Sequence, residues 1–385
     1  MRAQPVRDSS VVVLPDSSNF VVASLVVVQP ASSPMSSLGH VALRMQCPAY
    51  GLDFLWSQNT MDSPTLWMRQ LYGNNPVAGV WQPTDSMLNV YRNEQRGTRQ
   101  YTLNLTHHEK QRLWMLLDEV SEMGVNGRLR VDNHHCASAV IQQLKAATIQ
   151  RQLDTGDEQR EIGQYGQWAA RHSPWIQFAL VLMAGNQHDR MLSRDCMVCP
   201  EDIADYLKKA KLTDDNGKTQ PILTGEEKQL VPQAPPIAPL PLTPTTLLTI
   251  IAIAALCVTL ARQLGKKEHM AQVFDKVLFT AYCLWSIVFI DFVIIGNQLI
   301  GATWNWYLIP FNPIPLIVWS ICRNKQQPWQ RIWAIYSITL ALFLAITPIS
   351  TQIQFPQQII TVTLLIRTVD RYLKARKAKS VHNNH

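Results

Sequence analysis

The spacing of hydrophobic and polar residues divides the chain into two parts, which meet near residue 244. In the first part the apolar runs are short, and Phe20 to Val28 is rich in β-branched residues, which predicts a buried strand. A Ser/Pro loop follows, and a second strand is predicted to begin near His40. In an extended strand His40, Ala42 and Arg44 point to one face, so His40 and Arg44 could border one site.

The first part also contains two predicted amphipathic helices. One follows Thr106, an N-cap residue with Glu109 three positions later, and the two residues form a capping box. The other begins at or next to Cys136, because four apolar residues recur downstream at helical spacing: Val140, Ile141, Leu144 and Ala147. Residues 1–18 are polar and are predicted to form a poorly ordered tail.

From residue 244 onward the apolar runs become long enough for membrane helices. Five are predicted, over residues 244–262, 274–295, 306–322, 332–349 and 356–372. The stretch VPQAPPIAPLPLTP before them carries six prolines in fourteen residues, so residues 213–243 are predicted to form an extended linker. A basic tail over residues 373–385 ends the chain.

Of the four connections between the five apolar segments only the first and third contain lysine or arginine, and six more such residues follow at the end of the last segment and in the tail. By the positive-inside rule these connections and the C-terminus are cytoplasmic, and five crossings then place residues 19–212 outside the cytoplasm, at the inner membrane. The only apolar run near the N-terminus, FVVASLVVV, is nine residues long, too short to span a membrane. An extracytoplasmic location would therefore require a leader that is missing from this numbering.

The formal net charge of +7 is unevenly distributed. From residue 243 onward there are thirteen Lys and Arg against four acidic residues, so the preceding part carries a charge of about −2. A basic nucleic-acid-binding surface is therefore not expected in the front domain, and the positive charge belongs to the membrane part. The sequence does not indicate an oligomeric state.

Cys136 is the strongest candidate for chemistry, because the unpaired N–H groups at a helix start stabilise a thiolate. A cysteine nucleophile needs a base, usually a histidine. His40 is one candidate, and the adjacent His134 and His135 are competitors. Among the other cysteines, Cys196 and Cys199 form a CMVC pair that favours a disulfide or a structural role over redox chemistry.

Several motifs together resemble the Lnb-type family of bacterial membrane proteins, which is associated with lipoprotein N-acylation. The likeness lies in VVASLVVVQPASSPMSSLGHVALRM, in YRNEQRGTRQYTLNLTHHEK, in Gly185 with Asp189 and MVCP, and in ATWNWYLIPFNP. The implied fold is an α+β class, circularly permuted papain-like cysteine domain followed by a bundle of five transmembrane helices. In that order histidine precedes cysteine, as His40 and Cys136 do.

The sequence departs from the family pattern at one place beside the cysteine. The family usually has Asn directly before it, whereas this chain reads D-N-H-H-C, with His135 in that position. Either Asn133 reaches the site through a two-residue insertion, or His135 replaces it. Asn133 and His135 are thus possible helpers, and Arg44 could bind a lipid phosphate or structure the site.

The resemblance implies a thiol acyltransferase that needs no cofactor and no metal. Its acyl donor would be a phospholipid, its acceptor the amine of a lipoprotein, and its location the membrane, through an apolar passage lined partly by the segment around Trp56 to Trp81. Two alternatives remain: a cysteine peptidase or amidase that acts on cell-wall peptide, and a membrane receptor or scaffold without catalysis. The geometry of His40 and Cys136 separates these possibilities.

Overall fold

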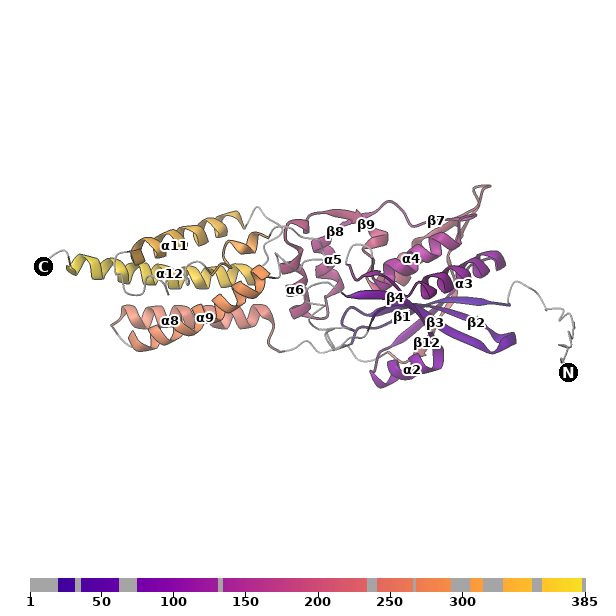
Figure 1. Ribbon diagram of the computed structural model, residues 1–385, viewed down its shortest axis with the longest axis horizontal. Coiled ribbons are helices and arrows are strands. Elements are labelled where there is room, and N and C mark those ends of the chain that lie inside the picture. Colours follow the sequence, from indigo (N-terminus) through magenta and orange to yellow (C-terminus); the bar gives the residue numbers. More distant parts are fainter. Residues whose placement is uncertain are drawn as a thin grey trace, which may run out of the picture.

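The computed structural model describes residues 20–31, 36–61, 75–130, 134–233, 241–265, 268–291, 305–313, 328–347 and 355–382. Figure 1 shows an elongated molecule with a sheet-containing domain at one end and a group of long helices at the other. Helix α6 (Pro174–Ala184) lies between the two parts. The predicted tail over residues 1–18 and Asn133 lie outside the described residues.

The domain is built on a seven-stranded antiparallel sheet with the order β12-β5-β1-β2-β3-β4-β6. Its strands are β1 (Val22–Val28), β2 (His40–Cys47), β3 (Leu52–Thr60), β4 (Pro76–Pro83), β5 (Thr98–Leu103), β6 (Val125–Arg128) and β12 (Leu223–Val231). The apolar run beginning at Phe20 thus forms the central strand β1, and the strand predicted at His40 begins there.

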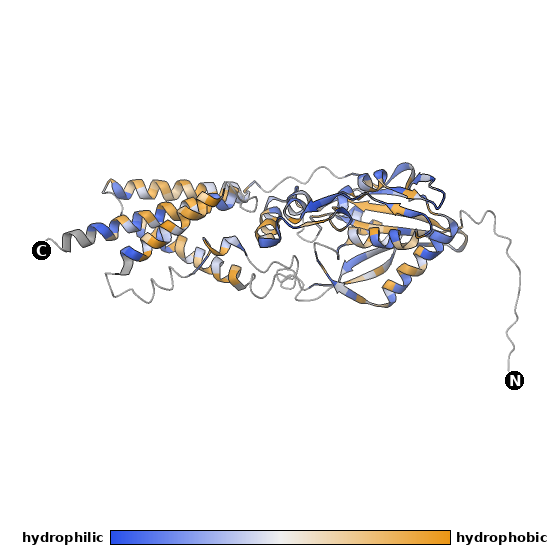
Figure 2. Ribbon diagram, turned by 90° about the horizontal axis from the view of Figure 1, so that it is seen from above, coloured by the Kyte–Doolittle hydropathy of each residue, from blue (hydrophilic) through white to orange (hydrophobic). Residues whose placement is uncertain are grey.

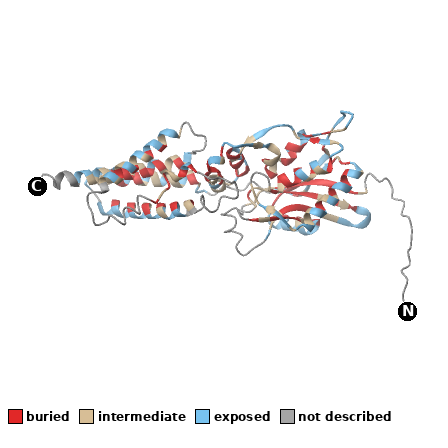
Figure 3. Ribbon diagram, turned by 45° about the horizontal axis from the view of Figure 1, so that its top comes forward, coloured by how far each residue is buried: buried red, intermediate tan, exposed pale blue. Residues whose placement is uncertain are grey.

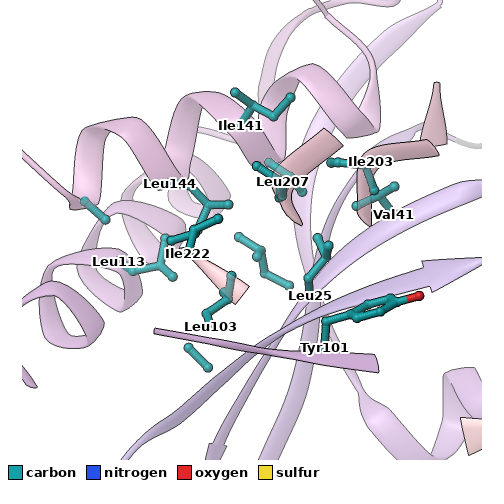
Figure 4. Close-up of a cluster of buried hydrophobic side chains, with 14 of the residues drawn as sticks. Leu25, Val41, Tyr101, Leu103, Leu113, Ile141, Leu144, Ile203, Leu207 and Ile222 are labelled. Carbon is teal, nitrogen blue, oxygen red and sulfur yellow. The ribbon is translucent and has the colours of Figure 1, made fainter. Parts of the chain in front are cut away.

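Helices cover both faces of this sheet. Helices α3 (His107–Glu122) and α4 (Cys136–Ala147) pack on one face, in a core that includes Val41, Leu43 and Leu144 (Figure 4). Helix α2 (Thr84–Asn93) packs on the other face, against a smaller cluster that includes Ala42 and Val28. Figure 3 shows the buried residues concentrated in the strands between these two layers. The predicted capping box at Thr106 and Glu109 is present.

Smaller elements complete the domain after α4. The strands are β7 (Gln152–Asp154), β8 (Gln159–Glu161), β9 (Met191–Ser193), β10 (Lys211–Thr213) and β11 (Thr219–Pro221). The helices are α5 (Ile162–Ala169), α7 (Ile203–Lys209) and the short 3₁₀ turns η2 (Pro48–Tyr50), η3 (Gly185–Gln187), η4 (Arg194–Cys196) and η5 (Pro200–Asp202). Helix α5 packs on α6 and thereby connects the sheet domain to the helical part.

The linker prediction over residues 213–243 is wrong in its first half. Strands β11 and β12 occupy part of that range, and β12 pairs with β5 to form the edge of the large sheet. Most of β12 is exposed and carries the polar sequence GEEKQ, so the alternation of apolar residues that indicates a buried strand is missing. Residues 234–240 of the proline-rich stretch lie outside the described residues.

The helical part contains α8 (Pro244–Gln263), α9 (Glu268–Asp291), α11 (Pro328–Ile346) and α12 (Phe355–His382) among the described residues. Figure 2 shows that these helices are the most continuously apolar part of the molecule. In the described part of the chain, α8 alone has the length and hydropathy of a full membrane span, and α11 contains a shorter apolar helix over 330–346.

The helix predicted to begin at residue 306 does not begin there. Residues Trp306–Leu308 form the 3₁₀ turn η7, which Asn305 caps by accepting a hydrogen bond from the Tyr307 N–H. Pro310 and Pro313 follow closely and lack the N–H groups that a helix would need. The rest of that predicted segment lies outside the described residues.

Buried charges join three of the long helices. Arg367 of α12 is fully buried and makes a two-pronged ion pair with Asp275 of α9, with N···O distances of 2.6 and 2.8 Å. Arg262 of α8 pairs with Asp370 of α12 beside it. A buried arginine without a partner would be strongly destabilising, so these pairs fix the mutual position of the three helices.

Candidate active site

Cys136 is the first residue of α4, and His135 is its N-cap. The His135 side chain accepts a hydrogen bond from the Ser138 N–H, and the Ser138 hydroxyl lies 3.1 Å from the His135 backbone nitrogen, which donates to it. The two residues thus form a capping box in which histidine takes the place of the usual serine or threonine. The cap fixes the position at which the chain enters the helix, and with it the thiol.

Both ring nitrogens of His135 are engaged. Nδ1 accepts from the Ser138 N–H at 3.4 Å, and Nε2 lies 2.8 Å from the Cys196 carbonyl oxygen, to which it must therefore donate. The buried ring also stacks on Tyr165 of α5, with 5.9 Å between ring centroids. A neutral imidazole in this tautomer has no free lone pair, so His135 is poorly suited to take a proton from Cys136.

Three backbone N–H groups act on the Cys136 thiol as hydrogen-bond donors that lower its pKa. Those of Cys136 and Ala137 belong to the first turn of α4, and the third, from Val41, belongs to β2. Burial raises the pKa of the Cys136 thiol to about 11, while these three groups and the charge of Arg96 act in the opposite direction. The thiol is therefore neutral at rest, and donors that can stabilise an anion already stand around it.

His40 adjoins this group of donors through the backbone. The Val41 nitrogen that reaches the sulfur is bonded to the His40 carbonyl carbon, so the start of β2 lies beside the start of α4. Burial, and to a smaller extent the charge of Arg96, lowers the pKa of His40 to about 4. His40 is therefore an uncharged imidazole at neutral pH, the form that a general base requires.

The residues around His40 set its direction at the end of the sheet. His40 lies opposite Val28 in the register and follows the alternation of Ala42, so its side chain leaves the strand on the face that α2 covers. Helix α4 lies on the other face. The pKa of Tyr91 in α2 is raised to about 12, mainly by burial. A negative charge on Cys136 contributes a smaller part of this increase. The His40 side chain and α4 thus lie on opposite faces at the same end of the sheet.

The backbone conformation of Gly39 explains why a glycine directly precedes His40. Its φ of +79° lies in the left-handed region, and a Cβ there would stand 3.0 Å from the Val28 carbonyl oxygen. Only glycine permits the tight turn that delivers His40 to the first position of β2. A larger residue at this position would move the start of the strand away from α4.

Arg44 has a structural role in this arrangement. Its Nε and Nη2 bind the two oxygens of Asp53 on β3, at 2.8 and 2.5 Å, and its Nη1 donates to Gln100 on β5 at 2.6 Å. All three guanidinium nitrogens are thus engaged within the sheet. Of the two roles considered for Arg44, the geometry favours ordering the site over binding a phosphate.

Arg96 is a residue of the site that the sequence did not single out. It is 6% exposed and acts electrostatically on both His40 and Cys136. Its Nε donates to the Gln29 carbonyl oxygen at 2.8 Å, directly after Val28, the strand partner of His40. The only sequence signal was its place in the family-like stretch YRNEQRGTRQY, where nothing distinguished it from the neighbouring arginines.

The remaining candidates lie elsewhere or have ordinary roles. The His134 ring packs against Gly127 of β6. The His134 backbone forms an isolated β-bridge with Arg130. Cys196 and Cys199 are both free thiols, so the disulfide is not formed, and burial raises the pKa of Cys199 to about 12. Cys199 is therefore an inert structural residue.

Two of the aromatic residues expected to line a passage from the membrane are hydrogen-bonded to α3. The buried Trp56 donates from Nε1 to Ser121, and Trp81 donates to Asp118, both residues of α3. Both rings pack in or against the same core as the start of α4. Residues 62–74 of the segment predicted to line the passage lie outside the described residues, so the lining stays a prediction.

One group of metal-ligating types occurs in the described part of the chain: Glu161, His188 and Asp189. The His188 Nδ1 lies 2.7 Å from the Asp189 carboxylate, and its Nε2 edge packs so closely on Gly163 that a Cβ there would be 2.1 Å away. A metal ion at Nε2 would collide with this backbone. The hydrogen bond between His188 and Asp189 accounts for the closeness of these two side chains.

The start of α4 faces the helical part of the molecule through α5 and α6. Tyr165 under His135 belongs to a cluster that also contains Leu38, two residues before His40. Helix α6 then docks on the long helices: Leu182 is buried among their aromatic residues, and its carbonyl oxygen accepts from the Asn305 amide at 2.6 Å. Figure 1 shows α5 and α6 at this junction. The site is thus on the side of the domain that faces the membrane part.

Two family models match the chain. The model of the Lnb N-terminal periplasmic domain matches residues 16–155, and that of the Lnb transmembrane domain matches residues 237–379. Together they cover most of the chain, including His40, Arg96 and Cys136. Neither a curated protein nor a solved structure matches it.

Proposed function

The chain belongs to the Lnb family, with a periplasmic domain followed by a transmembrane domain, and from this premise we propose that it is a thiol acyltransferase. Cys136 takes an acyl chain from a phospholipid as a thioester and passes it to an amine, the N-terminus of a lipoprotein. The observation that carries the proposal is the group of three N–H donors around the Cys136 sulfur, at the junction of α4 with the strand that begins at His40.

In the first half-reaction His40 accepts the thiol proton while the sulfur attacks the ester carbonyl carbon. The carbonyl oxygen becomes an oxyanion, which the N–H groups of Val41, Ala137 and Cys136 are placed to stabilise. The ester C–O bond then breaks, and the departing alcohol takes the proton from His40. The products are a lysophospholipid and the Cys136 thioester.

In the second half-reaction the amine attacks the thioester carbonyl carbon. His40 takes a proton from the attacking nitrogen, the C–S bond breaks, and the leaving sulfur recovers that proton from His40. An amide remains on the acceptor and the free thiol on Cys136. His40 thus acts once as base and once as acid in each half, as in other cysteine acyl-transfer enzymes. The proposal requires the imidazole to reach the sulfur round the end of β2, at the Gly39 turn.

The position of the site supports a lipid substrate over a soluble peptide. A phospholipid ester lies near headgroup level, and withdrawing its chains from the bilayer costs about 0.8 kcal/mol per methylene. A catalytic residue for such an ester must therefore work close to the membrane. The docking of α6 on the long helices, next to the α5 layer under His135, meets this requirement. A permuted papain-like fold with five transmembrane helices is part of the same proposal.

The thioester provides the direct test. The purified protein is incubated with phospholipid vesicles, and intact mass spectrometry is expected to show one acyl chain added, removable by hydroxylamine and located on Cys136. Cys136→Ala should show none, His40→Ala should form it at least about a hundredfold more slowly, and the double variant should be no worse than Cys136→Ala.

Two outcomes would contradict the proposal. An unmodified Cys136 together with cleavage of cell-wall peptides would assign a peptidase, and normal thioester formation in His40→Ala would remove His40 as the base. Cys196→Ala is the matched control. It removes another partly buried cysteine near α4 and should leave the thioester unchanged.

A further inference from the structure

Arg96 carries a hydrogen-bond donor that the fold leaves unused. Its Nε donates to the Gln29 carbonyl oxygen at 2.8 Å, and its Nη1 donates to Glu94 at 3.2 Å. Nη2 is buried and has no hydrogen-bond partner. A buried guanidinium N–H without an acceptor costs about 1–3 kcal/mol, so its retention calls for an explanation.

The surroundings hold the guanidinium in one orientation. The side chain stands over the Tyr91 ring, with 5.4 Å from its central carbon to the ring centroid. The backbone is fixed as well, because the Arg96 N–H donates to the Tyr91 carbonyl oxygen at 2.8 Å and closes the end of α2. One face of the guanidinium thus lies on the aromatic ring, and its Nε and Nη1 are hydrogen-bonded. Nη2 is the nitrogen that has no acceptor.

This donor stands at the same end of the sheet as the proposed catalytic residues. Gln29, which binds Arg96, follows Val28, and Val28 pairs with His40 across the first position of β2. The charge of Arg96 also reaches the Cys136 sulfur. An anionic group bound at Nη2 would therefore lie near any substrate attached to Cys136.

The chemical nature of the anionic group follows from the donors that are already in use. The developing oxyanion of acyl transfer already has three backbone donors at Cys136 and Val41. Arg44 is fully engaged with Asp53 and Gln100. A phospholipid donor has one permanent negative charge close to its esters, the phosphodiester, and a planar guanidinium is well suited to a phosphate.

We propose that Arg96 binds the phosphodiester of the acyl donor and thereby selects phospholipids over uncharged acylglycerols. The inference rests on the proposed function, because it concerns the donor of that reaction. Since Nη2 is covered in this structure, the donor must displace neighbouring side chains as it binds, and such rotamer changes are common on complex formation.

The first test measures binding without chemistry. The full-length protein in detergent is treated with iodoacetamide, and modification of Cys136 is followed by peptide mass spectrometry. A dialkyl-ether phosphatidylethanolamine, which has no ester to react, should protect Cys136 at a concentration at least about tenfold lower than a dialkylglycerol with the same chains. Equal protection by the two lipids would overturn the proposal, whatever the behaviour of any variant.

The variants assign the effect to Arg96. In Arg96→Gln the phosphate-containing lipid should lose its tenfold advantage, while protection by the dialkylglycerol stays unchanged. Arg99→Gln is the matched control: it removes a half-exposed arginine three residues away that faces Glu227 at 3.7 Å, and it should behave as wild type. An Arg96→Gln protein that melts as wild type and keeps the advantage would overturn the proposal.

The second test separates this inference from the proposed function. Thioester formation is compared between a phospholipid and a diacylglycerol, and Arg96→Gln should slow only the first. An equal loss with both donors would indicate that Arg96 contacts the reacting carbonyl, and would overturn the phosphate assignment. Protection by the ether phospholipid without any thioester would leave this inference standing and remove the acyltransferase.

Discussion

At the scale of the residue, the site at rest pairs an uncharged thiol with an uncharged imidazole. Burial holds the pKa of Cys136 at about 11 and that of His40 at about 4, so neither residue carries a charge between those values. A permanent thiolate would react with many electrophiles in the periplasm. In the proposed reaction proton transfer accompanies attack on the substrate, and the N–H donors act only when negative charge appears.

The low pKa of His40 predicts a loss of stability in acid. Unfolded, the imidazole has its ordinary pKa of about 6.5; folded, it binds a proton only near pH 4. As the pH falls from 6.5 to 4, the unfolded state binds the proton first, so this contribution to stability is lost across that window. The loss is on the order of 3 kcal/mol at pH 4.

Thermal unfolding of wild type and His40→Gln at pH 7, 5.5 and 4 checks this prediction. The wild type should lose more stability than the variant, because glutamine does not titrate. Two curves that fall in parallel would show that His40 is solvated. The variant's own destabilisation at pH 7 serves as the baseline and does not affect the comparison.

At the scale of the element, the start of α4 distinguishes the capping role of His135 from the role of base proposed for His40. We predict that His135→Asn keeps acyl transfer within about tenfold of wild type, because asparagine is a good N-cap and can still accept from the Ser138 N–H. Loss of the bond to the Cys196 carbonyl should lower the free energy of unfolding by about 1 kcal/mol.

Steady-state acyl transfer and thermal melting of the same protein measure the two effects. His40→Ala provides the contrast, since it should lose at least about a hundredfold in rate with little change in melting. Should His135→Asn fall as far as His40→Ala, His135 rather than His40 would be the base.

The local elements could be predicted because their signals lie within a few residues of one another. The periodicity after Cys136, the capping box at Thr106 and the start of β2 at His40 are of this kind. Arg96 could not be found in this way, because its partner Gln29 is distant in the sequence and only the sheet brings the two together. The same limit applies to Trp56, whose bond to Ser121 depends on how α3 crosses the sheet.

At the scale of the whole molecule, the docking of α6 connects the periplasmic domain to the transmembrane domain. Asn305 caps η7 with its side-chain oxygen and donates to Leu182 with its amide nitrogen, and it is almost completely buried. We predict that Asn305→Ala slows acyl transfer from membrane phospholipids by about tenfold. The reaction of Cys136 with a soluble iodoacetamide should stay unchanged, because the start of α4 is not touched.

Comparing the two rates in nanodiscs tests this coupling. Asn312→Ala is a suitable control, since the side-chain amide of that residue donates to the nearby Ile309 carbonyl oxygen, three residues before it. A parallel loss of both reactions in Asn305→Ala would mean that the substitution unfolds the domain instead of loosening its attachment.

The orientation in the membrane is also open to direct measurement. We expect that a reporter active only outside the cytoplasm works when fused before residue 240 and fails when fused after residue 375, because the charged connections favour the cytoplasm. A cytoplasmic reporter fused at the same two positions should give the opposite pattern. If the same reporter were active at both positions, the chain would cross the membrane an even number of times between them.

The ion pairs among the long helices have a consequence for the order of assembly. Arg367 enters the membrane part near the end of the chain, and its partner Asp275 lies in a helix made much earlier. Until α12 is made, Asp275 lacks the Arg367 guanidinium, and a carboxylate in an apolar environment without its partner is energetically costly. Helix α12 thus brings the cation that neutralises Asp275 of α9 and the carboxylate that neutralises Arg262 of α8.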